Sequence, residues 1–291
     1  MPHTDIQIPR WLEPFSAKAK AFAHLMRLDR PIGTWLLLLP GWWAIALYAP
    51  KRWDLFILFG IGAVVMRGAG CVINDLWDHK MDAKVARTKG RPLPSKRVTR
   101  REAYAFLFLL LMIGFSILMT MSEAAIWIGV ISIAFIVIYP LMKRITWWPQ
   151  LFLGLTFNFG ALLGAAAAKD YLPVNAWWMY AAGIFWTLGY DTIYAHQDKE
   201  DDALVGIKST ARLFAGNSKA WVASFYLSFM ALLMFAVPSI WLLIPAAHFA
   251  WQVKAWDMDD PASSLRFFKS NRDAGLLILL VILLSGAAAG G

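Results

Sequence analysis

The sequence is short of the residue types on which most soluble enzymes depend. Its 291 residues include one cysteine and five histidines, and only 16% are charged, whereas 59% are hydrophobic and 16 are tryptophan. A single cysteine, Cys71, excludes an intrachain disulfide and a cluster of thiolate ligands. The histidines lack the spacing of a zinc site. Such an apolar composition predicts an all-α, polytopic membrane protein.

Motifs of nucleotide and serine chemistry are also missing. The chain has no P-loop, no GxSxG elbow and no dinucleotide fingerprint, which removes support for nucleotide hydrolysis and for serine hydrolase chemistry. Residues 1–30 are polar and basic without a signal-peptide core, so we expect the first hydrophobic segment to stay in the mature protein. The net charge of +9 is spread over many loops, so we expect no nucleic-acid partner.

The hydrophobic segments predict about nine transmembrane helices, because a helix needs about 20 residues to cross a bilayer. Short turns make hairpins of spans three and four and of spans seven and eight. We interpret the chain as one domain over residues 1–291, built from two four-helix repeats plus one helix. The predicted spans are residues 32–48, 53–74, 103–121, 124–142, 149–168, 176–196, 220–237, 239–253 and 273 to the end.

Charge and amphipathicity predict how these spans are oriented. Residues 8–28, within the N-terminal segment 1–28, mix aromatic and basic side chains and predict an amphipathic helix on the membrane surface. Only Lys51, Arg52 and Lys169 fall in loops on one side of the membrane, and nearly all other basic residues fall on the opposite side. The positive-inside rule then places the N-terminus in the cytoplasm and the C-terminus outside, in a bacterial inner membrane.

The most informative stretch is residues 67–94, where an apolar span runs into acidic and then basic residues. Asn74, Asp78 and Asp82 follow one another at i, i+4 and i+8, so on a helix they line one face. Arg67 lies seven residues before Asn74 and shares that face. One helix face therefore carries a buried cation below a carboxylate cluster, and a polar loop over about residues 75–101 follows.

A second acidic stretch, residues 190–211, falls on the same predicted side of the membrane. Asp191, Asp198 and Asp202 are spaced by seven and then four residues, which again predicts one helical face. Oxygen ligands from two helices suit Mg²⁺, which substrate phosphates commonly complete. We therefore predict a metal-diphosphate site with the metal ligands Asn74, Asp78, Asp82, Asp198 and Asp202.

A diphosphate bound through Mg²⁺ also needs cations or donors for its other oxygens. Arg87 and Arg91 lie four residues apart, and Lys143 and Lys208 each lie next to a span end. As a set they are typical of a phosphate clamp. Tyr139 lies near the same surface and is a further candidate for substrate binding, although tyrosines at membrane interfaces are common without function.

At these residues the sequence resembles a known family. Residues 74–93 and 190–211 resemble the paired NDxxDxxxD and DxxxD-type motifs of the UbiA superfamily of intramembrane prenyltransferases. Together with residues 27–43, RLDRPIGTWLLLLPGWW, these motifs look most like the branch that acts on 4-hydroxybenzoate. The resemblance implies a nine-helix fold and a Mg²⁺-dependent transfer of a polyprenyl chain to the ring carbon ortho to the phenol hydroxyl, in ubiquinone synthesis.

The resemblance also implies roles for individual residues. The five metal ligands would hold the metal-diphosphate with the cations named above. Arg67 and Arg30 would bind the benzoate carboxylate, and Asp191 would lie near the phenol, where it either takes the ring proton or orients the hydroxyl. We count Asp191, Asp75 and Arg67 as the candidate catalytic residues. The extra acid Asp201 and the histidine at position 79 are small departures from the family pattern.

Other functions stay open at this stage. Enzymes that act on other aromatic acceptors would carry the same motifs. The cation of Arg67 favours a benzoate, because the carboxylate of a benzoate needs a positively charged partner. An ion-coupled transporter would place acids near the middle of its spans, whereas these acids gather at one membrane face. A phosphotransferase acting on CDP-alcohols would show a DGxxAR run, which is missing. The expected partners are polyprenyl diphosphate, 4-hydroxybenzoate and membrane lipid, without an obligate protein partner.

Overall fold

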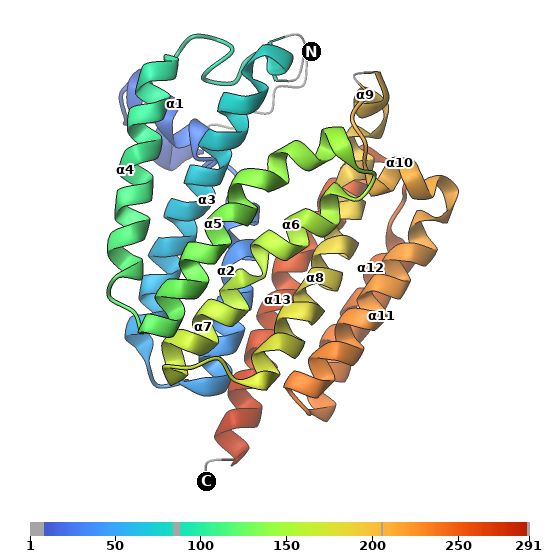
Figure 1. The fold of residues 1–291 in the computed structure, drawn as a ribbon. Helices are drawn as coiled ribbons and strands as arrows, with labels where there is room; N and C mark the ends of the chain where they lie inside the picture. The colour runs from blue at the N-terminus through green and yellow to red at the C-terminus, as the bar shows by residue number, and fades with distance from the viewer. Residues whose placement is uncertain (1–8, 84–87, 205, 290–291) are drawn as a thin grey trace. The chain divides into compact units, whose positions relative to one another are not determined.

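The chain is helical throughout the part that the structure describes. The computed structural model describes residues 9–83, 88–204 and 206–289, and every regular element in these ranges is a helix (Figure 1). The residues form two compact units, each with more contacts within itself than with the rest of the chain. The first unit comprises Met1–Trp35 and Gly60–Thr120, and the second comprises Leu36–Phe59 and Met121–Gly291. The all-α prediction is confirmed.

The first unit is built on α3 and α4, with the N-terminal helix packed against them. Thr99 and Glu102 form a capping box at the start of α4, which satisfies backbone N–H groups that have no partner within the helix. Its elements are η1 (Arg10–Leu12), α1 (Ala17–Leu25), the start of α2 (Ile32–Tyr48), most of α3 (Trp53–Asp82) and α4 (Arg100–Leu118).

The N-terminal helix is shorter than predicted, and its apolar face contacts protein. α1 buries Leu25 in a cluster with residues of α3 and α4. The ring of Phe22 lies 4.7 Å from that of Phe106, and Lys18 Nζ forms a 2.6 Å ion pair with Glu102. The predicted helix over residues 8–28 is thus the 3₁₀ turn η1 and the helix α1, which packs against α3 and α4, and its place at the membrane surface stays a prediction.

The second unit is organised around α8, which packs against α6, α7, α11 and α13. Trp43 of α2 fills its centre, because the indole Nε1 donates to Gly275 O at 2.9 Å and the ring lies 4.9 Å from Trp186. The further elements of this unit are α5 (Glu123–Ile145), α6 (Pro149–Phe157), α7 (Phe159–Lys169), α8 (Val174–Ala195), η2 (His196–Asp198), α9 (Lys199–Leu204), α10 (Thr210–Phe214), η3 (Ala215–Asn217), α11 (Ser218–Ala236), η4 (Ile240–Leu242), α12 (Leu243–Ala255) and α13 (Pro261–Ala289).

Neutral hydrogen bonds hold the last helix of this unit in place. The side chain of Asn271 on α13 accepts from Trp186 Nε1 at 2.9 Å and from the Tyr226 hydroxyl at 3.1 Å. Its amide Nδ2 donates to Gln252 Oε1 at 3.2 Å. All four residues are buried, and paired polar groups are required there because an unpaired one costs about 1–3 kcal/mol. This network joins α8, α11, α12 and α13.

The predicted fifth span is found as one apolar segment, Pro149–Lys169, and it is bent at Asn158. This residue leaves the helical conformation, with φ −89° and ψ 0°. Its buried side chain donates to Gly154 O at 2.8 Å and to Thr187 Oγ1 at 2.9 Å. A side-chain amide that bonds to nearby backbone competes with the helical hydrogen-bond ladder, so this segment consists of the two helices α6 and α7.

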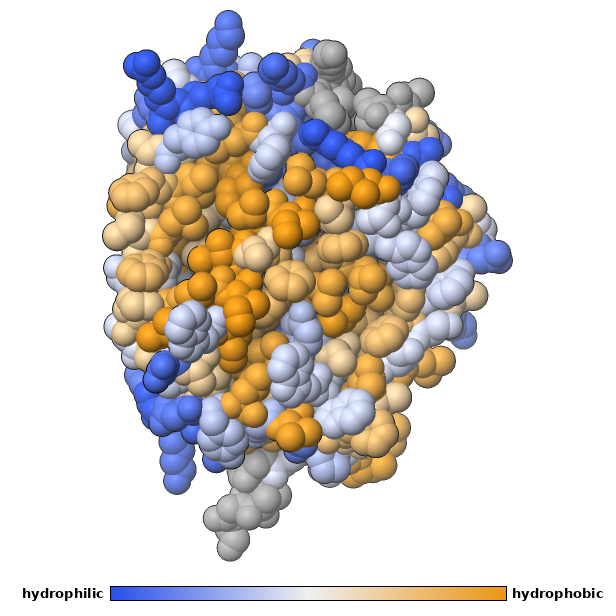
Figure 2. Space-filling model, in the orientation of Figure 1, coloured by the Kyte–Doolittle hydropathy of each residue, from blue (hydrophilic) through white to orange (hydrophobic). Residues whose placement is uncertain are grey.

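Several helices are long enough and apolar enough to cross a membrane. The described residues hold five such segments, and α2 is a shorter apolar helix. Hydrophobic side chains cover the viewed surface of the second unit over α5 and α6 (Figure 2), as expected for helices that face lipid. The count of nine spans and the repeat stay predictions. The five segments are Trp53–Lys80, Arg100–Leu118, Glu123–Ile145, Pro149–Lys169 and Thr210–Ala236.

The bend at Asn158 predicts a strict requirement for glycine at position 183. A Cβ added at Gly183 would lie 2.0 Å from Asn158 Oδ1, whereas a Cβ added at the helical residue Gly62 would meet nothing within 4 Å. We expect Gly183→Ala to destabilise the protein by about 1–3 kcal/mol through overpacking. Thermal unfolding in detergent measures this, with Gly62→Ala as the matched control. Equal melting temperatures for the two variants would contradict the packing described.

Candidate active site

The first acidic motif lies on the last turns of α3. The helix continues to Asp82, so the polar loop begins about two turns later than predicted. Asn74, Asp78 and Asp82 share one face of this helix, as the spacing indicated. Asp78 and Asp82 are buried, with 4% and 8% of their surface exposed. Buried carboxylates at the end of an apolar helix need partners of opposite charge.

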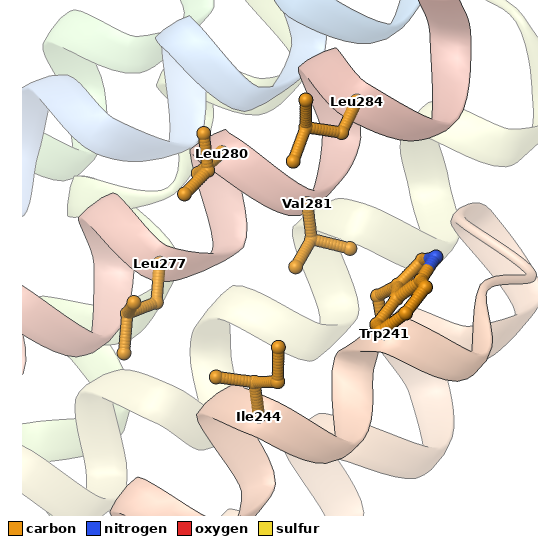
Figure 3. Close-up of a pocket in the computed structure, with 6 residues that line it drawn as sticks. All are labelled: Trp241, Ile244, Leu277, Leu280, Val281 and Leu284. Atoms are coloured by element: carbon orange, nitrogen blue, oxygen red, sulfur yellow. The ribbon is translucent and has the colours of Figure 1, made fainter. Parts of the chain in front are cut away.

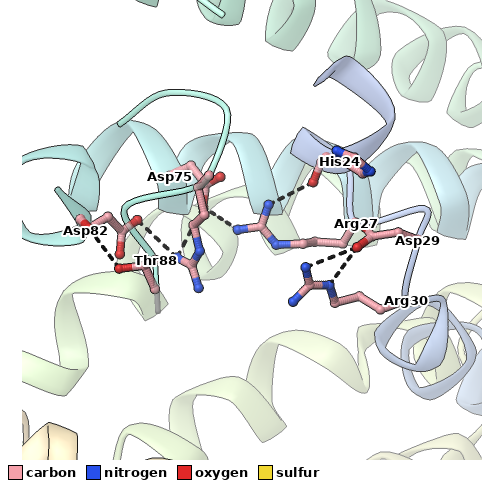
Figure 4. A network of polar contacts seen from close by, with 8 residues as sticks. His24, Arg27, Asp29, Arg30, Asp75, Asp82 and Thr88 are labelled. Atoms are coloured by element: carbon pink, nitrogen blue, oxygen red, sulfur yellow. Dashed lines mark hydrogen bonds and ion pairs between the residues drawn. The ribbon is translucent and has the colours of Figure 1, made fainter. Parts of the chain in front are cut away.

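Arginines supply such partners for Asp82 and for the neighbouring Asp75 (Figure 4). Asp75 is fully buried, and its Oδ1 accepts a 2.7 Å bond from Arg27 Nη2. Arg91 Nη1 lies 3.0 Å from Asp82 Oδ2 and 3.7 Å from Asp75 Oδ1, so this guanidinium bridges two carboxylates of α3. Charge-assisted bonds of this kind are about twice as strong as neutral ones, and they fix both side chains. Asp75 therefore acts as the anchor of the two cations.

The turn before α2 places two further charged residues. Arg27 adopts φ +61°, a left-handed conformation that costs a residue with a Cβ about 1–2 kcal/mol. Its bonds to Asp75 and to His24 O, at 2.9 Å for the latter, hold it there. Arg30 Nη2 lies 3.0 Å from the buried carboxylate of Asp29. The predicted site residue Arg30 is thus oriented by its neighbour Asp29.

The loop after α3 is tied back to the end of that helix. Thr88 Oγ1 donates to Asp82 O at 2.9 Å, and Arg91 reaches the Asp82 side chain. Burial raises the pKa of Asp82 above its usual value, the positive charge of Arg91 opposes this rise, and the carboxylates of Asp75 and Asp78 add to it. The ionised form of Asp82 therefore depends on a nearby cation.

Arg67 lies on α3 below this cluster, against the start of α2. A Cβ at Gly33 would lie 2.6 Å from Arg67 Nε and 2.9 Å from Nη2, so the absence of a side chain at Gly33 makes room for the guanidinium. The side chain is half-buried, which is less than predicted. This contact holds the cation beside the backbone of Gly33 on the side of α3 that carries Asn74.

The second acidic motif does not lie on one continuous helix. Asp191 is on α8, which ends at Ala195, and Asp198 is on the 3₁₀ turn η2, which precedes α9. A 3₁₀ turn has 3.0 residues per turn and not 3.6, so the regular spacing of Asp191, Asp198 and Asp202 is interrupted at η2, and their shared face stays a prediction. The side chain of Asp202, like residue Arg87, lies outside the described residues.

Histidine and tyrosine near this motif have structural partners. His196 is buried, and its Nδ1–H donates to Met258 O at 3.1 Å. The ring of His196 also lies edge-on to that of Trp256, with 5.0 Å between the ring centres. The ring of Tyr194 lies 4.5 Å from that of Phe268, which fixes the end of α8 against α13.

The remaining predicted cations lie at the end of α5. Lys208 donates its backbone N–H to Lys143 O at 3.0 Å, and its Nζ donates to Ile145 O at 3.0 Å. The segment after α9 therefore runs beside the last turn of α5, where Tyr139 precedes Lys143 by one helical turn. The two acidic motifs belong to different units, and their convergence on one ion stays a prediction.

The donors on α3 fit a hard cation chemically. Asn74, Asp78 and Asp82 offer amide and carboxylate oxygens, the ligands that Mg²⁺ prefers. Asp82 already binds positive charge from Arg91. Among the described residues, no three carboxylate, histidine or cysteine side chains converge on one point, so this face alone provides an incomplete set of ligands. Substrate phosphate oxygens or further carboxylates would complete it.

An apolar pocket of the second unit plays no part in binding phosphate. It lies between α13 and the segment that forms η4 and α12 (Figure 3), and it is lined by Trp241, Ile244, Leu277, Leu280, Val281 and Leu284. Its volume is about 240 Å³. With a lining of hydrocarbon and one indole, it offers neither cations nor carboxylates to a diphosphate.

The sequence reasoning missed Arg27, Asp29 and Thr88. Arg27 and Asp75 are separated by 48 residues, so no local spacing connects them. The segment RLDRP, which contains Arg27 and Asp29, offered a weak signal, because three charged residues directly precede an apolar span. Thr88 gave no signal, since its role depends on the fold of the loop.

The geometry can be compared with known proteins. The model of the UbiA prenyltransferase family matches residues 36–287. The chain is 47% identical over 277 residues to the mitochondrial 4-hydroxybenzoate polyprenyltransferase of Aedes aegypti, which covers 90% of this chain and 63% of that protein. The chain thus spans slightly less than two thirds of that relative's length. It is 44% identical over 289 residues to the mitochondrial 4-hydroxybenzoate polyprenyltransferase of Rattus norvegicus, which covers 95% of this chain and 75% of that protein.

Solved structures support the fold. A UbiA homologue from Archaeoglobus fulgidus bound to GPP and Mg²⁺ superposes with a TM-score of 0.67 at 16% identity, covering 93% of this chain and 100% of that one. At this identity the similarity concerns the arrangement of helices. Together with the family match over most of the sequence and the relatives described above, it leads to one conclusion: this chain belongs to the UbiA prenyltransferase family.

Proposed function

We propose that the protein transfers a polyprenyl group from polyprenyl diphosphate to the ring carbon ortho to the hydroxyl of 4-hydroxybenzoate. The observation that carries this proposal is the acidic face of α3, held by arginines, in a chain 44–47% identical to relatives named 4-hydroxybenzoate polyprenyltransferase. In the reaction the allylic C–O bond breaks and diphosphate leaves. A C–C bond then forms to the ring, and the ring carbon loses its proton to a base.

In this proposal the carboxylates bind the metal ion, and the cations bind the oxygens of the diphosphate. Asn74, Asp78 and Asp82, with Asp198 and Asp202, would hold Mg²⁺, which neutralises charge on the leaving diphosphate when bound. Arg91 and Lys143, with Arg87, would donate to the remaining oxygens. Lys208 is a weaker candidate for the diphosphate, because its ammonium is directed toward the Trp147 ring, 6.0 Å from the ring centre. Tyr139 would add a hydroxyl donor beside Lys143.

The acceptor needs a cation and a group near its phenol. Arg67 is the first cation for the benzoate carboxylate, because Gly33 gives its guanidinium room beside α2. Arg30, oriented by Asp29, is the second. Asp191 would orient the phenol or accept the ring proton. Asp75, which the sequence suggested as a catalytic residue, is paired with Arg27 and lies near Arg91. In this proposal it contributes by positioning these two cations.

The remaining expectations form part of the same proposal. We infer one domain with about nine spans, a role in ubiquinone biosynthesis and a place in a bacterial inner membrane. The N-terminus and the acidic loops would lie in the cytoplasm and the C-terminus outside. The relatives carry mitochondrial names, so an organellar membrane is the competing location. The uneven distribution of Lys and Arg supports the orientation in either membrane.

Prenyl transfer in membranes tests the function directly. Membranes that contain the protein are incubated with polyprenyl diphosphate, Mg²⁺ and radiolabelled 4-hydroxybenzoate, with EDTA as the control. We expect label in a lipid-extractable product only when metal is present. Product with another aromatic acceptor in its place would correct the acceptor alone, and no product with any acceptor would contradict the proposed reaction.

Loss of a metal ligand should remove activity without unfolding the protein. We expect Asp78→Ala to lower the transfer rate at least about a hundredfold, because the charge that develops on the leaving diphosphate loses its stabilisation. The matched control is Asp54→Asn, which removes an exposed carboxylate from the same helix. Normal turnover by Asp78→Ala would contradict the metal assignment, and thermal unfolding verifies that both variants fold.

Loss of Arg67 should act mainly on the acceptor. We expect Arg67→Ala to raise the KM for 4-hydroxybenzoate about ten- to a hundredfold, the effect of losing a charged hydrogen bond. The KM for polyprenyl diphosphate should change little. Arg67→Lys, which keeps the charge, should recover part of the affinity. Steady-state kinetics with each substrate varied in turn provide the values, and an unchanged acceptor KM in Arg67→Ala would contradict this role.

A further inference from the structure

Two cations flank an exposed tryptophan in the second unit: Lys208, near the end of the second acidic stretch, and Arg212 on α10. Lys208 Nζ lies 6.0 Å from the centre of the Trp147 ring, and Arg212 Cζ lies 5.4 Å from it. Trp147 is 39% exposed. We call these three residues the Trp147 patch. A cation within about 6 Å of an aromatic face is attracted to it, so the ring gathers the two charges at one place.

Backbone carbonyls hold the two cations. Lys208 Nζ donates to Ile145 O at 3.0 Å, and Arg212 Nη1 donates to Ile207 O. A carbonyl orients a cation without neutralising its charge. Within the described residues neither Lys208 nor Arg212 forms an ion pair with a carboxylate, and residues 139–150 and 206–221 contain no Asp or Glu. The positive charge is therefore available to an external anion.

The patch lies where membrane-crossing helices end. The apolar segments Glu123–Ile145, Pro149–Lys169 and Thr210–Ala236 all begin or end within a few residues of it. Ile145 is 64% exposed and Leu213 41% exposed, so hydrophobic side chains flank the cations. Tryptophan prefers the interface between lipid and water. The patch thus pairs positive charge at headgroup level with an apolar surface beside it.

We propose that the Trp147 patch binds the phosphate of an anionic phospholipid. The guanidinium of Arg212 and the ammonium of Lys208 bind the headgroup phosphate, and the acyl chains lie along Ile145 and Leu213. Charge complementarity favours an anionic over a zwitterionic lipid. The exposed apolar neighbours favour a lipid over a soluble phosphate, which would leave them in contact with water.

Native mass spectrometry of the detergent-purified protein tests this proposal, with phosphatidylglycerol and phosphatidylcholine as the lipids. We expect one phosphatidylglycerol to bind more tightly than phosphatidylcholine. The double variant Lys208→Gln/Arg212→Gln should bind it about thirtyfold more weakly, about fivefold for each surface cation lost. The matched control, Lys51→Gln/Lys254→Gln, removes two exposed cations elsewhere and should bind as the wild type does.

Further measurements separate charge from folding. Lys208→Arg/Arg212→Lys keeps both charges and should keep the affinity for phosphatidylglycerol. In the wild type, raising NaCl from about 0.05 to about 0.5 M should weaken binding, because salt screens exposed charges. Equal binding of both lipids, unchanged affinity in the glutamine variant, or no effect of salt would overturn the proposal. Displacement of the lipid by inorganic phosphate at similar concentration would assign the patch to a soluble anion.

Discussion

The acidic end of α3 depends on the cost of burying a carboxylate. Asp75 has no exposed surface, and an isolated charge in such a place would cost several kcal/mol. Arg27 and Arg91 compensate for this cost, and the segments that carry them also pack Leu25 and Leu93 in the hydrophobic cluster of α3. The same ion pairs that make burial possible therefore also bring the turn before α2 and the loop after α3 to the candidate site.

Neutral polar groups form the buried hydrogen bonds between the helices of the second unit, and the carboxylates of the candidate site lie near the C-terminal end of α3. In the second unit Asn271, Gln252 and Tyr226 are bonded to one another through amides and hydroxyls, none of which carries charge. In hydrocarbon, burial of a neutral hydrogen-bonded group costs much less free energy than burial of an ion. This division leaves the ends of the helices as the place where a charged substrate and its metal can be bound.

The two proposed phosphate sites differ in how their cations are held. On α3 the arginines are paired with carboxylates, an arrangement suited to a diphosphate that arrives with a divalent cation. Around Trp147 the cations face an aromatic ring and carbonyl oxygens, so their net charge is suited to an anion without a metal. A reaction that joins a lipid-soluble donor to a polar aromatic acid requires both a charged site and secure placement in the membrane.

Local pattern determined much of this protein from the sequence alone. The apolar runs gave the helical class and the bounds of α2, and the spacing of Asn74, Asp78 and Asp82 gave the acidic face of α3, because a helix repeats every 3.6 residues. The bend at Asn158, the 3₁₀ turn at His196 and the pairing of Arg27 with Asp75 were decided only in the tertiary structure. Each depends on a partner far away in the chain or on competition between local and distant hydrogen bonds, and periodicity carries no information about either.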